Sequence, residues 1–369
     1  MRLLQKECGK CLRHPFLWIV CITFGLFQFL SIYTYVGNAG MRKELRQMHV
    51  AVTDEETASP EYESAYADYK KTYGGMYDTL DMRKILEQKE KKSGYEPQGV
   101  WGSWIVRNYD RLQKRVEQIR KTGEGTYAFY PGNWYKLHTT LYGKLWKNLI
   151  LQTAVLMILS MLYLMDYERI YKTQDLVLAT TTGKKMMEKK MLAGTLCGLF
   201  YAGLLTVFTL LVFFAAVPFQ NLWHVPVAAC MAAEPRLQMM YPFVTFWRLE
   251  QWRYLLLALV VLVGLLGIIA AVTAAVQLFL QNSYFSFAVL GLLFMGAYLL
   301  AYVQMGNVWD LIREFFNPTV LYATSGGWFM ENDLCLSFAG NEFAVLFCSG
   351  TAAVCLMAVE KRRYHRLEV

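Results

Sequence analysis

The chain has 369 residues, of which 55% are hydrophobic and only 18% are charged, and its net charge is +8. Soluble domains have roughly 25% charged residues, so the composition argues against a soluble enzyme or binding domain. Several long stretches contain no Asp, Glu, Lys or Arg, and about 20 apolar residues let a helix cross the bilayer core. No stripe of phosphate-binding residues is present, which argues against nucleic acid as a partner.

Residues 1–14 are basic, and Leu4, Cys8 and Cys11 fall on one helical face. This pattern predicts a cytoplasmic interfacial helix that lies on membrane lipid. The spacing of Cys8 and Cys11 also occurs in zinc and redox sites, but His14 is the only further ligand nearby. The simpler interpretation is two small residues on a helix, and we expect no metal site.

The apolar stretches predict an all-α integral membrane protein with six transmembrane helices. The predicted spans are 15–36, 148–165, 191–217, 254–280, 284–305 and 343–359. The first span is longer than the apolar region of a cleaved signal peptide, so we expect it to be retained. None of these ranges contains an acidic or basic residue, which argues against an intramembrane proton relay.

Residues 37–147 are hydrophilic and predict a large helical insert between the first two spans. Glycine pairs and polar turns divide it into helices at 60–73, 78–92 and 100–121. In the last helix, apolar residues recur at helical spacing and predict a packing face: Trp101, Trp104, Ile105, Leu112, Val116 and Ile119.

Flanking charges predict the orientation. Residues 1–14, the 166–190 loop and the 361–369 tail are rich in Lys and Arg, whereas the 306–340 loop is mainly acidic. Because cytoplasmic loops carry the excess of basic residues, both termini are expected in the cytoplasm. The insert is also basic, but long domains translocate largely regardless of charge, so we expect it to be extracytoplasmic. Cys230 and Cys335 would then share the outer side, where a disulfide between them is an open alternative.

Motifs for chemistry within this chain are absent from the sequence. Gly183, Lys184 and Lys185 do not form a P-loop, because Leu178 stands where the first glycine belongs and no Ser or Thr follows the Lys. The chain has neither an HExxH zinc motif nor a GxSxG nucleophile elbow. We therefore expect no catalytic residues.

The 166–190 loop carries the most informative pattern. Residues 175–179 predict a short helix between charged flanks, ending near the turn at 180–183. A short helix between two spans can insert into a groove on a soluble partner. A solvated connector whose lysines only set the orientation fits the pattern equally well.

The order of these features resembles the ABC type-2 permeases. In that family the loop after the second span carries Glu, a leucine-rich helix, a small-residue turn and basic residues. The matching positions here are Glu168, Leu176-Val177-Leu178, Thr180 to Lys185, and Lys190. Asn317-Pro318 in the last external loop is similar to a recurrent feature of the family, where this loop folds back into the membrane as a gate.

The resemblance implies a permease subunit of an ATP-driven exporter in the bacterial cytoplasmic membrane. A separate ABC ATPase would hold ATP and Mg and dock on the 166–190 loop, with a second permease copy or sister chain completing the dimer. The coupling residues would be Glu168, Asp175, Leu176, Leu178, Gly183, Lys184 and Lys185. The 306–340 loop would be re-entrant, and the apolar spans suit cargo such as a peptide, an antimicrobial or a lipid-like compound.

Two other classes remain open. In a membrane sensor or scaffold, the extracytoplasmic insert would bind a ligand and the 166–190 loop would recruit a signalling partner. A polytopic enzyme acting on lipid would need a polar cluster near an interface, for which the scattered His49, His138, His224 and Glu234 are the candidates.

Overall fold

A computed structural model describes residues 2–38, 42, 77–93, 99–124, 137–173, 183–217, 219, 222–229, 244–303, 308–331 and 338–367. Within these ranges the regular secondary structure is helical, apart from two isolated bridges that join Pro226 to Glu250 and Thr245 to Met330. The helices are α1 (Arg2–Leu12), α2 (Pro15–Gly37), α5 (Met82–Ser93), α6 (Gly99–Thr122), η2 (Thr139–Leu145), α8 (Trp146–Met165), α9 (Tyr167–Ile170), α11 (Gly183–Ala216), α12 (Gln251–Leu280), α13 (Ser283–Ala301), α14 (Val308–Phe316), α15 (Thr319–Ala323), η6 (Ser325–Gly327) and α16 (Asn341–Leu367).

Six helical segments are long and apolar enough to cross a membrane. They are Pro15–Gly37, Thr139–Met165, Met186–Ala216, Gln251–Leu280, Ser283–Ala301 and Asn341–Tyr364. Large apolar side chains on them face outward, and Leu292 and Phe347 are each 74% exposed, as expected of side chains that face lipid. The prediction of a helical, multi-pass membrane protein is confirmed for the described residues.

Local sequence explains where several spans begin and end. Pro15 opens α2 at a position where a missing backbone N–H costs nothing. Between α12 and α13, Gln281 adopts a left-handed conformation with φ of 52°. The Asn282 side chain then accepts a 3.1 Å hydrogen bond from Phe285 N and caps α13. Two residues therefore reverse the chain between these spans.

The second and third spans begin earlier than predicted. Helix continues back to Thr139 before α8 and to Gly183 before α11, so the predicted boundaries at 148 and 191 are wrong. The spans as the structure bounds them contain charged residues, contrary to the prediction: Lys144, Lys147, Glu188, Lys189, Lys190, Arg253, Glu342, Glu360, Lys361, Arg362 and Arg363. These residues lie in the first or last turns of the candidate spans, where helical backbone hydrogen bonding continues past the apolar stretch, so charge alone does not end a helix.

Glycines bring α11 close to α8. A Cβ atom on Gly194 would lie 2.9 Å from Met161 Sδ, and one on Gly198 would lie 2.5 Å from Met157 Sδ and 3.1 Å from its Cα. Glycines four residues apart let two spans approach closely, since no side chain stands between the backbones. α8 is consequently the central and most buried span.

α1 packs on the bundle. It contacts α11 and α8, Cys11 is fully buried, and Leu4 and Cys8 pack against the same core. The apolar face that predicted a helix lying on lipid therefore contacts protein instead.

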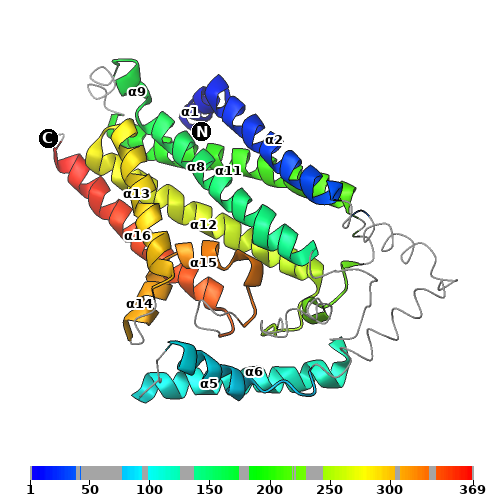
Figure 1. Cartoon of the computed structure of the whole chain (residues 1–369). Helices are drawn as coiled ribbons and strands as arrows, with labels where there is room; N and C mark the ends of the chain where they lie inside the picture. The colour runs from blue at the N-terminus through cyan, green and yellow to red at the C-terminus, as the bar shows by residue number, and fades with distance from the viewer. Residues whose placement is uncertain are drawn as a thin grey trace.

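The termini and the insert lie at opposite ends of the bundle. Figure 1 shows both termini at the end where α9 lies, while α5 and α6 cross the other end. The predicted helices 78–92 and 100–121 correspond to α5 and α6, whereas 60–73 lies outside the described residues. Four residues of the predicted packing face are buried, namely Ile105, Leu112, Val116 and Ile119.

The segment 306–340 contains short helices on either side of Asn317-Pro318. α14 contacts α16, and α15 contacts α13 and α8, so this part of the chain turns back against the spans. Gly326 of η6 approaches η2 so closely that a Cβ atom on it would lie 3.1 Å from Gly143 Cα.

Candidate coupling site

Three charged residues, Asp166, Glu168 and Arg169, follow the last apolar residue of α8. α8 ends at Met165, and the single helical turn α9 carries Glu168 and Arg169. Thr173 N donates a 2.8 Å hydrogen bond to Glu168 O, which closes the segment after this turn. The backbone of 166–173 is therefore compact, and its side chains point to elements on two sides.

On one side, Glu168 joins α9 to α1 and α11. Its side chain is buried, Lys10 Nζ lies 3.2 Å from Oε1, and Lys190 Nζ contacts Oε2. Lys10 Nζ also lies 2.6 Å from Oε1 of the buried Glu7. We call Glu7, Lys10, Glu168 and Lys190 the Glu168 cluster. Two carboxylates and two ammonium groups balance, which buried charges require if they are to remain ionised.

On the other side, Asp166 joins the same segment to the turn between α12 and α13. Asp166 Oδ2 accepts a 2.8 Å hydrogen bond from Ser283 Oγ and a 3.4 Å bond from Ser283 N. Arg169 Nη2 donates to Gln281 Oε1 at 3.4 Å. Asp166 therefore satisfies backbone and side-chain donors at the first residue of α13.

Aromatic contacts reinforce the attachment to α1. Lys10 Nζ lies 4.4 Å from the centre of the Tyr167 ring, a cation–π distance. Tyr167 in turn packs against Tyr163 and Tyr171, with ring centroids 5.7 Å and 4.6 Å apart. The segment after α8 thus holds α1 by charge and by ring contacts together.

The cysteines of α1 lie beside this cluster. Cys197 Sγ of α11 lies 3.8 Å from Cys8 O, and both Cys8 and Cys11 are free thiols. Burial, with a further contribution from Cys197, raises the pKa of the Cys8 thiol to about 11. A thiol that stays protonated is a poor nucleophile and metal ligand, and no group of three or more metal-ligating side chains occurs among the described residues.

The structure describes part of the predicted coupling set. Glu168 is buried in the cluster, Gly183 begins α11, and Lys184 and Lys185 follow it in the first helical turn. Three predicted coupling residues lie outside the described residues, namely Asp175, Leu176 and Leu178. The last eight residues of the coupling loop predicted over 166–190 are helical, because α11 begins at Gly183.

Sequence reasoning missed Glu7, Lys10 and Asp166 as site residues, and it gave Lys190 only as a position that matches the family pattern. Glu7 and Lys10 have the spacing of a helical ion pair, which was the only available signal. Lys10 and Glu168 are separated by 158 positions, and no local pattern predicts a contact over that distance.

The predicted gate residues form a helix cap. Asn317 Oδ1 accepts hydrogen bonds from Thr319 N at 3.1 Å and Thr319 Oγ1 at 2.6 Å, an arrangement typical of Asn at turns. Asn317 Nδ2 donates to Ala297 O at 2.7 Å, and Pro318 immediately precedes α15. Asn317 therefore ties α15 to the last part of α13.

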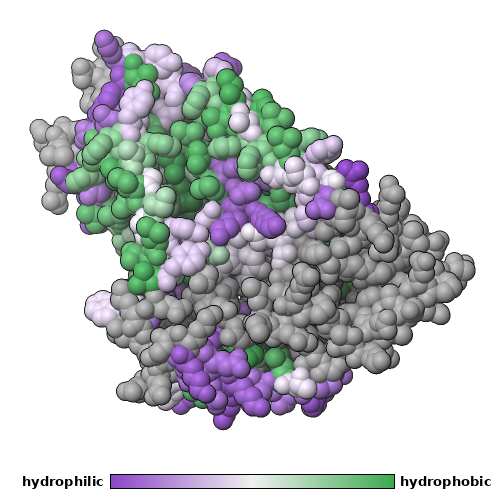
Figure 2. Space-filling view, in the orientation of Figure 1, coloured by the Kyte–Doolittle hydropathy of each residue, from purple (hydrophilic) through white to green (hydrophobic). Residues whose placement is uncertain are grey.

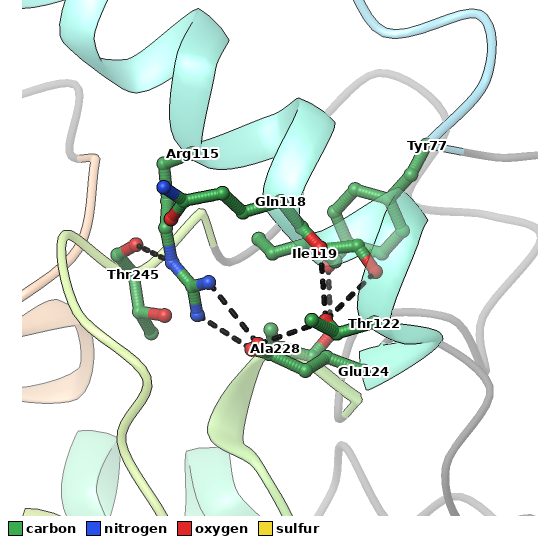
Figure 3. Close-up of polar contacts among 8 residues, drawn as sticks. All are labelled: Tyr77, Arg115, Gln118, Ile119, Thr122, Glu124, Ala228 and Thr245. Carbon is green, nitrogen blue, oxygen red and sulfur yellow. Dashed lines mark hydrogen bonds and ion pairs between the residues drawn. The ribbon is translucent and has the colours of Figure 1, made fainter.

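At the opposite end, α6 is attached to the segment that precedes α12. Figure 3 shows Arg115 between Thr245 and Glu124: Nε donates to Thr245 O at 3.2 Å, and Nη1 and Nη2 donate to the Glu124 carboxylate at 3.1 Å and 2.5 Å. Tyr77 OH donates to Ala228 O at 2.7 Å.

A second polar contact joins the insert to the segment before α16. Lys89 pairs with the buried Glu331, and Tyr109 OH donates to Glu331 Oε1 at 3.2 Å. Burial raises the pKa of Tyr109, so its hydroxyl stays protonated as a donor. The described part of the insert is therefore attached to two other segments at the same end of the bundle.

Comparisons of the chain with protein-family models, with curated proteins and with solved structures found no match.

Proposed function

We propose that the chain is the membrane-spanning subunit of an ATP-binding-cassette exporter, driven by a separate ATPase that docks on 166–190. The observation that supports this proposal is the double attachment of the segment after α8. Glu168 connects it to α1 and α11, and Asp166 connects it to the start of α13. A partner that displaces this segment would therefore move three other helices with it.

The Glu168 cluster would transmit such a displacement from the segment after α8 to α1 and α11. Buried, mutually paired charges tolerate little separation, because separating them exposes each to an apolar surrounding. The segment is thus expected to move as a unit with α1 and α11. ATP-driven closure of the partner would shift the bundle between two arrangements through differential contacts.

In this proposal the end that carries α9 and both termini is cytoplasmic. The insert, the segment before α12 and the segment before α16 are extracytoplasmic, in agreement with their mutual contacts at one end. The membrane is the bacterial cytoplasmic membrane, a second permease copy or sister chain completes the unit, and the cargo is a peptide, an antimicrobial or a lipid-like compound.

Co-purification from native membranes tests the proposal. The full chain carries a C-terminal tag and is solubilised in mild detergent, and the proteins that co-purify are identified. We expect a P-loop ATPase with wild type and its loss with Asp175→Arg and with Leu178→Asp. Asp78→Arg, an exposed position on the insert, is the control that should retain it.

Two outcomes contradict the proposal. One is the absence of any ATPase in several mild detergents, and the other is an ATPase whose recovery is unchanged by both loop substitutions. Recovery of a signalling protein that the loop substitutions remove would instead favour the sensor or scaffold.

A further inference from the structure

α8 exposes one narrow stripe of side chains. Its buried residues cover most of the helix surface, and the partly or fully exposed ones are Lys147, Asn148, Leu151, Val155, Leu159 and Tyr163. Five of these recur every four positions, a spacing that places each side chain next to the following one on the helix surface. The stripe begins with Lys147 and continues with three apolar residues before Tyr163, so its only charge lies at one end.

Three helices form the polar end of the stripe. Lys147 Nζ of α8 lies 5.2 Å from the centre of the Tyr322 ring of α15 and 5.8 Å from that of Tyr298 of α13. The hydroxyl oxygens of Tyr298 and Tyr302 lie 2.9 Å apart. Lys144, one turn before Lys147, is exposed. The rings lie against the Lys147 ammonium. One of the Tyr298 and Tyr302 hydroxyls donates to the other, so one proton of this pair is available to a further acceptor.

Lys147 has no carboxylate within ion-pair distance among the residues that the structure describes. Other lysines of this bundle form ion pairs with carboxylates: Lys10 and Lys190 pair with Glu168, and Lys361 pairs with Glu188. Among the residues that the structure describes, the Lys147 ammonium therefore lies beside two tyrosine rings and no carboxylate, and an anion would complement its charge.

The position of Lys147 along the span matches the level of lipid headgroups. Met165 ends α8, and eighteen residues separate it from Lys147 along the sequence. At 1.5 Å per residue the two lie about 27 Å apart, close to the ~30 Å thickness of the hydrocarbon core. If Met165 lies at one edge of the core, Lys147 lies at the other.

We propose that Lys147, Tyr298 and Tyr322 bind the phosphate of an anionic phospholipid, with an acyl chain along Leu151 and Val155. Figure 1 shows α8 in front of the bundle, and Figure 2, from the same side, shows a hydrophilic patch that borders a larger hydrophobic surface. Leu151 is 54% exposed, and the neighbouring α13 exposes Leu299 to 61%.

The apolar continuation of the stripe favours a lipid over a free anion. Inorganic phosphate would contact the ammonium and the hydroxyls but none of the apolar side chains. An anionic headgroup would be present at this level in the bilayer itself, where a basic residue near the surface strengthens binding of anionic lipid.

Thermal unfolding of the purified full chain in a neutral detergent tests the site. The midpoint is measured while phosphatidylglycerol, phosphatidylcholine or inorganic phosphate is added. We expect stabilisation by phosphatidylglycerol alone, with about fivefold weaker apparent affinity in Lys147→Gln, as expected for the loss of one basic residue at a headgroup. Lys189→Gln, an exposed lysine on α11, should bind as wild type does.

Several results would overturn the proposal. Equal stabilisation by phosphatidylcholine would show that charge is not recognised, and equal stabilisation by inorganic phosphate would show an anion site without lipid. Unchanged affinity in Lys147→Gln would place the lipid elsewhere. If Lys147→Gln does not fold, Tyr322→Leu, which keeps the lysine and removes one ring, provides the same comparison, and Tyr322→Phe should restore binding in part.

Discussion

Glu168 of α9 connects α1 and α11 through its side chain. It lies between Lys10 and Lys190, and its side chain is almost completely buried. Removing one member of a buried charge pair leaves its partners uncompensated, which typically costs about 3–5 kcal/mol. The intact cluster therefore adds little net stability, but the loss of any one of its charged side chains should destabilise the folded protein.

Glu168→Gln is expected to lower the free energy of unfolding by about 3 kcal/mol, because the buried Lys190 then loses the carboxylate that it contacts and Lys10 keeps only Glu7. The measurement is thermal unfolding of the purified protein in detergent. Glu188→Gln is the matched control, since Glu188 pairs with Lys361 at 2.7 Å in an exposed position, where such pairs contribute at most about 1 kcal/mol. Equal shifts in the two variants would contradict the role assigned to the cluster.

A second residue-scale feature is the close approach of α11 to α8 at Gly198. We expect Gly198→Ala to destabilise the protein by about 1–3 kcal/mol through overpacking against Met157, although Ala is the better helix former. Gly203→Ala on the same helix adds a Cβ atom to open space and should be neutral or stabilising. Unfolding midpoints of the two variants decide the question, and a neutral Gly198→Ala would refute the close packing.

Among the elements, α6 depends on Arg115 for its attachment to the segment before α12. Arg115→Met removes the donor to Thr245 O and leaves the buried Glu124 carboxylate with the Thr122 hydroxyl alone, so this attachment should loosen. We expect faster amide hydrogen exchange along α6, measured by mass spectrometry.

Arg83→Met is the control for that measurement. Arg83 pairs with Asp110 at 2.8 Å, but both side chains are exposed, and exposed pairs contribute little. If α6 exchanges equally fast in both variants, the Arg115 contact does not hold the insert in place.

The helical elements could be predicted from sequence more reliably than their ends. Uninterrupted apolar residues predict each span, because a segment this apolar needs either lipid or a core around it. The starts of the second and third spans were predicted too late, since charged residues such as Lys147 and Lys190 were taken to end a helix. Their side chains find rings or carboxylates in the folded chain, and those partners are remote in sequence.

The candidate site was only partly predictable from the sequence, because its contacts join residues that are far apart along the chain. Glu168 follows directly from its place after the second span, but its contacts with α1 and α11 depend on tertiary packing. Asn317-Pro318 was predicted as part of a gate from the family resemblance, whereas the bond of Asn317 to Ala297 O depends on the folded arrangement of α13 and α15.

At the scale of the whole molecule, six crossings by the candidate spans would put the two termini on the same side of the membrane. We expect a C-terminal GFP fusion to the full chain to fluoresce and a C-terminal alkaline phosphatase fusion to be inactive, because the basic tail predicts a cytoplasmic C-terminus. A fusion after Thr122 should behave in the opposite way. The reverse pattern at both positions would invert the orientation.

The contacts of the insert also determine when its packing can be completed during synthesis of the chain. Tyr77 and Ala228 are 151 positions apart, and Lys89 and Glu331 are 242 apart. At 5–20 residues per second, roughly 10–50 s pass between synthesis of Lys89 and of Glu331. In the earlier part of that interval, before residue 244 is made, the apolar face of α6 lacks Val244 and at first also Ala228, which complete its core. Biogenesis therefore includes a period in which the insert is synthesised but incompletely packed, and a chain truncated before residue 331 would remain in that state.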